Sequence, residues 1–218
     1  MITMRQCWLI VLSMLVLLCC EVRSFGQSDA SEMLDRKLDI HVSKTTLRYV
    51  IDVLAMDHGI PTGLEKSSTH KDEYKIDLDI EGGALREVLD SIVRQEPSYQ
   101  WQVIDGVINF IPTHDRDGFV VTFLDTPVNR FAPGKGNDKL DVRDSILKSP
   151  TVRRLMISYG IGVDRWWGEC VYAKDGVDLS ISNTNVRGIL NKLIRVSPNK
   201  TWTVDLSGKN RESLLILF

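Results

Sequence analysis

The feature that most constrains this chain is an internal repeat. Residues 76–103 align without a gap on residues 177–204, at an offset of 101 positions. Nine positions are identical, among them Trp101 and Trp202, and most other apolar positions exchange one aliphatic residue for another. A repeat of about 100 residues is too long for a solenoid unit and matches the size of a small domain. The sequence therefore predicts two copies of one module.

The first 26 residues have the layout of a secretory signal peptide. Arg5 supplies a positive charge, Trp8 to Cys20 is almost wholly apolar, and Ser24 and Gly26 are small residues suited to a cleavage site. This apolar run is shorter than the roughly 20 residues that a membrane-spanning helix needs, although retention as an anchor stays open. We expect an exported protein, periplasmic or secreted, without membrane insertion after cleavage.

The composition excludes some classes of function. The chain has 27 Lys and Arg against 29 Asp and Glu, a formal net charge of −2 and no basic block, which argues against nucleic acid as a partner. Cys170 is the only cysteine beyond residue 26. A processed chain therefore forms no internal disulfide, and its stability must come from its core.

Residues 38–112 predict the order strand, helix, strand, strand, helix, strand, strand. Apolar residues recur at helical spacing after Thr46 and again after Gly83, whereas the other segments alternate or form short apolar runs. Asp105-Gly106 lies between the last two apolar runs, which is the strongest short-range signal for a hairpin. Residues 27–37 are expected to form a flexible N-terminal segment.

The second module is expected over residues 119–218, after the polar, turn-rich boundary at residues 112–118. We predict a strand at Phe119–Leu124, a Pro/Gly-rich loop, a short helix at Asp141–Leu147 and a helix from Ser149-Pro150 to Tyr159. The predicted fold is α+β: two tandem βαββαββ-type modules, each with two helices packed on small sheets.

The first module resembles a known family. The run TLRYVIDVLA at residues 46–55 is followed by a Gly-Ile-Pro turn, ALREVLDSIV at residues 84–93, and strands at residues 99–103 and 108–112. This succession resembles the short N-terminal (STN) domain of secretins and TonB-dependent receptors, also called secretin N0-like. The resemblance covers residues 38–112, and the second module more loosely. It implies a non-enzymatic, bacterial periplasmic module that contacts partner proteins.

No arrangement of residues predicts catalysis, a cofactor or a metal. The four histidines are scattered, and none stands at metal-ligand spacing from another His or Cys. Asp77 and Asp79 share one strand face, but a half-solvated sheet needs such a polar row in any case. No nucleophile and base pair can be assembled, so we expect a protein that is not an enzyme.

The strongest candidate for a binding surface is the aromatic segment 164–172. It contains Trp166, Trp167 and Tyr172, whereas the first module has a polar sequence at the same place. Two adjacent tryptophans cannot both face one core, so one is expected at a partner surface, together with the loop 127–137. Packing of this segment over its own module stays open as the alternative.

A second candidate is the pair Arg86 and Arg187, which recur at the repeat offset. They are either contacts for an anionic partner group or part of a solvated helix face. Trp101 and Trp202 are expected to fill equivalent core sites. The sequence thus predicts an envelope protein that binds an unidentified protein, with exposed sheet edges as docking sites. The alternative is a carbohydrate- or peptidoglycan-binding protein that uses Trp166 and Trp167.

Overall fold

The computed structural model describes residues 30–67, 76–132, 142–163, 180–198, 200–207 and 213–218. Within these residues helices and strands are both abundant, so the predicted α+β class is confirmed. No helix in this part of the chain is long and apolar enough to cross a membrane.

From Lys37 to Pro112 the element order is the one that the sequence predicts. Residues 30–35, which we expected within a flexible N-terminal segment, form a helix instead, because Leu34 is buried in the core of the first half. The further elements of this half, up to Pro112, are β1 (Lys37–Thr45), α2 (Leu47–Met56), β2 (Thr62–Glu65), β3 (Ile76–Ala84), α3 (Leu85–Gln95), β4 (Tyr99–Ile104) and β5 (Val107–Pro112). Thr46 caps α2, because its side-chain oxygen accepts a hydrogen bond from the Tyr49 N–H. Asp105 and Gly106 both have positive φ, 52° and 71°, as a type I′ turn between β4 and β5 requires.

The second half begins with a helix where we predicted a strand. Its elements are α4 (Gly118–Asp125), β6 (Pro127–Phe131), α5 (Val142–Leu147), α6 (Pro150–Tyr159), β7 (Gly162–Val163), β8 (Ile181–Asn185), α7 (Val186–Val196), β9 (Thr201–Ser207) and β10 (Ser213–Leu217). The strand predicted at Phe119–Leu124 is wrong for a local reason. The Asp117 carboxylate accepts hydrogen bonds from the Phe119 and Val120 N–H groups and so starts α4.

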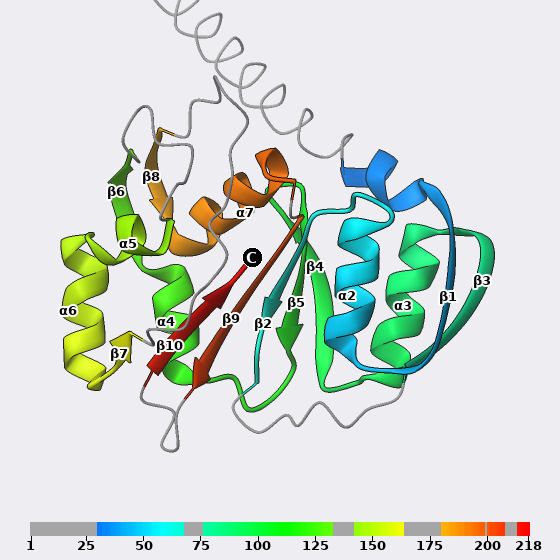
Figure 1. The fold of residues 1–218 in the computed structure, drawn as a ribbon, viewed down its shortest axis with the longest axis horizontal. Coiled ribbons are helices and arrows are strands. Elements are labelled where there is room, and N and C mark those ends of the chain that lie inside the picture. The colour runs from blue at the N-terminus through cyan, green and yellow to red at the C-terminus, as the bar shows by residue number, and fades with distance from the viewer. Residues whose placement is uncertain (1–29, 68–75, 133–141, 164–179, 199, 208–212) are drawn as a thin grey trace, which may run out of the picture.

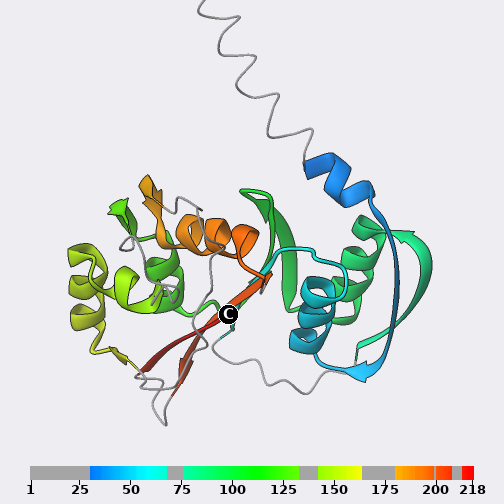
Figure 2. The same ribbon diagram turned by 45° about the horizontal axis from the view of Figure 1, so that its top comes forward.

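A six-stranded sheet joins the two halves, with the strand order β4-β5-β2-β9-β10-β7. The sequence predicts separate small sheets. Here β2 pairs in parallel with β5 on one side and with β9 on the other, which leaves all four of its residues buried. Two further pairs, β1-β3 and β6-β8, form separate two-stranded sheets. Helices α2 and α3 lie between β1-β3 and the large sheet (Figures 1 and 2).

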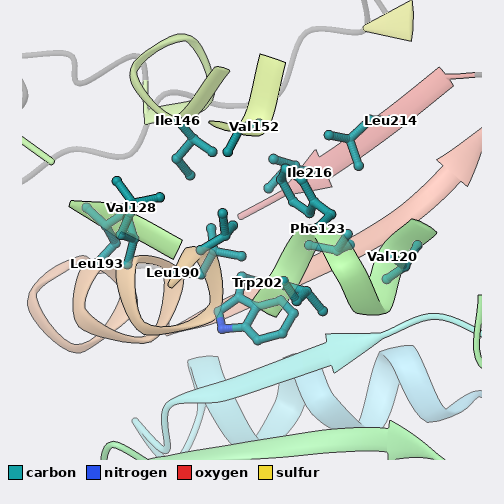
Figure 3. Close-up of a cluster of buried hydrophobic side chains, with 14 of the residues drawn as sticks. Val120, Phe123, Val128, Ile146, Val152, Leu190, Leu193, Trp202, Leu214 and Ile216 are labelled. Atoms are coloured by element: carbon teal, nitrogen blue, oxygen red, sulfur yellow. The ribbon is translucent and has the colours of Figure 1, made fainter. Parts of the chain in front are cut away.

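The two halves use opposite faces of the six-stranded sheet. Leu64 and Phe110 face the core of the first half, which α2 and α3 cover. Trp202 and Val204 belong to the core of the second half, which α4 and α7 cover (Figure 3). One arrangement occurs twice along the sheet: an antiparallel hairpin followed by a strand parallel to its second strand. The two instances are β4-β5-β2 and β9-β10-β7. Since β2 is parallel to β5 and to β9, β9 runs opposite to β4.

Candidate functional site

The free edge of the large sheet at β4 is the first candidate site. Among the described elements β4 pairs only with β5, and the pairing runs from Tyr99 to Ile104 without a bulge. The strand contains no charged residue and no proline, which are the usual means of protecting a sheet edge. In an antiparallel hairpin, hydrogen-bonded and non-hydrogen-bonded residue pairs alternate, starting with a hydrogen-bonded pair next to the type I′ turn. The backbone N–H and C=O groups of Trp101 and Val103 therefore point away from β5.

Trp101 is held in place on this edge by α3. Its indole N–H donates a hydrogen bond to the Asp90 carboxylate, 3.0 Å away, and its ring is half-buried. Trp202 makes the matching contact in the second half, where its N–H donates to the Asn191 side-chain oxygen at 2.8 Å. Trp202 is fully buried. The prediction of a core site therefore holds for Trp202, whereas Trp101 lies at the surface of its core.

The difference between the two tryptophans comes from β2. Gly63 lies opposite Trp202 in the parallel pairing of β2 with β9. A Cβ atom on Gly63 would lie 2.3 Å from the Trp202 ring, so the indole is in direct contact with the glycine backbone. No described strand covers Trp101 in this way, because β4 is the end of the sheet.

Arg86 and Arg187 are also placed differently. Arg86 is exposed in the first turn of α3. Arg187 is in the first turn of α7 and is 5% exposed. It donates to Glu65 Oε2 at 2.9 Å and to Asn109 Oδ1 at 3.3 Å, and its guanidinium lies 5.9 Å from the centre of the Trp202 ring. Arg187 is thus neither a solvated residue nor a contact for an external partner.

Glu65 is the buried centre of an ionic cluster between the halves. Its carboxylate is fully buried and also accepts two hydrogen bonds from Arg116, at 2.7 and 2.8 Å. These bonds raise the pKa of the Arg116 guanidinium above its usual value. Sequence reasoning missed this cluster, because Arg187 recurs in the repeat but its partner Glu65 does not belong to the repeated segment.

The aromatic segment lies outside the described residues. Trp166, Trp167 and Tyr172 all fall within residues 164–179, so their assignment to a partner surface stays a prediction. Part of the loop 127–137 is described as β6. It borders a cavity of about 580 Å³ between β6 and α6. Three exposed basic side chains line this cavity: Arg130, Lys148 and Arg154.

The carboxylates of β3 have structural partners. Asp77 accepts hydrogen bonds from the Lys44 N–H at 2.8 Å and from the Ser43 hydroxyl at 2.9 Å, and these bonds lower its pKa. Asp79 lies 2.7 Å from the His41 ring, and both side chains are exposed. Within the described residues no three His, Cys, Asp or Glu side chains form a group that could hold a metal ion.

No family model matches this chain, and no curated protein sequence matches it significantly.

Proposed function

We propose that this chain is an exported, non-catalytic protein of the bacterial envelope, and that it binds another protein through the free edge at β4. It is built from two STN-like modules. Export to the periplasm rests on the N-terminal sequence, which lies outside the described residues.

Several positional matches support two modules of one kind. Helices α3 and α7 begin and end 101 residues apart. Gly59 and Gly160 both have φ of 65°, and Gly82 and Asn183 both have positive φ, of 57° and 53°. Left-handed backbone at matching positions indicates the same turns in both copies. The hydrogen bonds of Trp101 and Trp202 to α3 and α7 match as well.

The observation that carries the function is the unprotected edge of β4. An edge with unpaired N–H and C=O groups is a template for another strand, and strand addition is a common mode of protein recognition. In the second half the matching strand β9 has a strand on that side, β2. The carbonyl groups of Lys200, just before β9, and of Val204 accept hydrogen bonds from the N–H groups of Thr62 and Lys66, at 2.8 and 3.0 Å. On β4, the backbone groups at the matching positions pair with no strand among the described residues.

The test is capture of envelope proteins by the purified chain with and without a blocked edge. Val103→Pro removes an outward N–H of β4 and places a ring on the free edge, a position where proline is tolerated. Gln102→Ala is the matched control, because it changes an exposed side chain next to the same backbone. We expect Val103→Pro to abolish capture and Gln102→Ala to retain it. Equal capture by a folded Val103→Pro variant, as judged by circular dichroism, would contradict the proposal.

A further inference from the structure

We propose that the surface formed by α3 and β4 binds an extended peptide segment that runs parallel to β4 and carries a small residue followed two positions later by an acidic residue. This inference rests on the proposed role of β4 as a docking edge and names the chemistry of the ligand. We call the surface of Arg86, Asp90, Trp101 and the β4 edge the α3–β4 surface.

The template for the ligand is contained in the chain itself. The α3–β4 surface has its counterpart in Arg187, Asn191, Trp202 and the edge of β9, each 101 positions further along. In the second half this counterpart is covered by β2. Both tryptophans are fixed by the same bond to the preceding helix. The residues with which β2 contacts α7 and β9 therefore indicate which residues of a ligand would contact α3 and β4.

The small residue is required by the indole ring. Gly63 of β2 lies opposite Trp202, and a Cβ atom there would come within 2.3 Å of the ring. That distance is far below van der Waals contact, so the ring must move before any larger residue is accommodated. Trp101 is anchored to Asp90 in the same manner. A strand added beside β4 would therefore need glycine, or a residue close to it in size, opposite Trp101.

The acidic residue is required by the arginine at the start of the helix. Arg187 reaches past β9 to Glu65, two residues after Gly63 in β2, and donates to its carboxylate at 2.9 Å. Arg86 has the same position on α3 and is exposed. No carboxylate pairs with it in the described part of the chain. An acidic side chain at the matching position of an added strand would give Arg86 a charge-assisted bond.

The backbone geometry fixes the direction of the ligand. β2 runs parallel to β9. The N–H groups of Thr62 and of Lys66, which follows β2, donate to two carbonyls four residues apart, those of Lys200 and Val204. In a parallel pair, the N–H and C=O groups of one residue bond to the two residues that flank its partner on the neighbouring strand. The same arrangement on β4 would engage the outward backbone groups of Trp101 and Val103.

The test uses a labelled peptide with the sequence of residues 59–67, which contains β2, titrated into the full chain and followed by fluorescence anisotropy. We expect saturable binding. Peptides with Glu65→Gln and with Gly63→Leu should bind at least about tenfold more weakly, since they lose the ionic bond and the small residue. In the chain, Arg86→Ala should weaken binding of the parent peptide by a similar factor. It should also remove the preference for the parent peptide over the Glu65→Gln peptide. Binding that is equal for a scrambled peptide would overturn the inference.

The location of binding separates this inference from displacement of β2. Hydrogen exchange should show new protection at residues 99–104. Changes confined to residues 201–207 would mean that the peptide replaces β2 on β9, and would overturn the inference. If Val103→Pro abolishes partner capture but the peptide shows no sequence preference, this inference fails and the proposed function stands. If the peptide binds as expected but Val103→Pro leaves partner capture unchanged, the proposed function fails instead.

Discussion

Arg187 Nη2 lies 2.9 Å from Glu65 Oε2, although the two residues are 122 positions apart in the sequence. This bond joins α7 of the second half to β2 of the first half. A buried ion pair has a high desolvation cost, and its best-supported role is to select one arrangement over others. Here it accompanies the parallel pairing of β2 with β9, so we expect it to favour the register in which the two halves form one sheet.

Removing one partner of this pair should be strongly destabilising. We expect Arg187→Ala to lower the free energy of unfolding by about 3 kcal/mol, because Glu65 stays buried with one fewer donor. Arg86→Ala is the matched control at the same helix position. It should change the free energy by no more than about 0.5 kcal/mol, since Arg86 is exposed. Urea denaturation measures both. Equal effects of the two substitutions would show that the pair does not stabilise the junction.

A second prediction concerns the contact between β2 and β9. Gly63→Ala places a methyl group against the Trp202 ring, which is fully buried and cannot easily move. Such overpacking should cost about 2 kcal/mol. Gly118→Ala is the control, because a Cβ atom there meets nothing within 4 Å. It should leave the free energy of unfolding within about 0.5 kcal/mol of the parent. An unchanged denaturation midpoint for Gly63→Ala would contradict the close contact.

The indole hydrogen bonds allow a third comparison. Asn191 is fully buried and binds both the Trp202 N–H and the Ile104 carbonyl. Asn191→Ala should cost about 2 kcal/mol, because buried polar groups lose their partner. Asp90→Ala removes the matching bond to Trp101 at an exposed position and should cost less than about 1 kcal/mol. Thermal or urea unfolding of both variants measures the two losses of stability. A larger loss for Asp90→Ala would mean that the α3–β4 surface is not exposed.

Most of the local elements could be predicted from the sequence, but their assembly could not. Helices α3 and α7 follow from apolar residues at helical spacing, and the Asp105-Gly106 turn follows from its residue types. The strand predicted at Phe119–Leu124 was wrong, because an apolar run of that length suits either structure and the cap at Asp117 decides it. The pairing of β2 with β9 has no local signal at all, since it joins residues about 140 positions apart.

The same limit applies to the candidate site. The repeat identified Arg86 and Arg187 as a matched pair, and it contains both tryptophans. It did not show that only one member of each pair is covered, because the covering strand β2 lies outside the aligned segment. The free edge at β4 is therefore a property of the assembled sheet. The prediction for Trp166 and Trp167 concerns residues outside the described part of the chain and stays a prediction.

The last prediction concerns the pH dependence of stability. The Asp77 carboxylate accepts a hydrogen bond from the Lys44 N–H, and a second from the Ser43 hydroxyl. Both bonds favour the charged form and lower the pKa of Asp77 from its ordinary value of 3.8. Lys44 has a φ of 47°, in the left-handed region, within an irregular part of β1. The carboxylate therefore holds a backbone conformation that a lysine rarely adopts.

A lowered folded-state pKa fixes the sign of the effect. The charged carboxylate stabilises the fold fully above the pKa of the unfolded chain, near 4, and this stabilisation is lost as the pH falls through the lower pKa of the folded state. We expect the parent to be more stable than Asp77→Asn at pH 7, with a difference that shrinks below about pH 4. Urea denaturation of both proteins between pH 2 and 7 measures this difference, and an NMR titration of the Asp77 carboxyl measures its pKa. A midpoint above 3.8 would contradict the role assigned to Lys44 and Ser43.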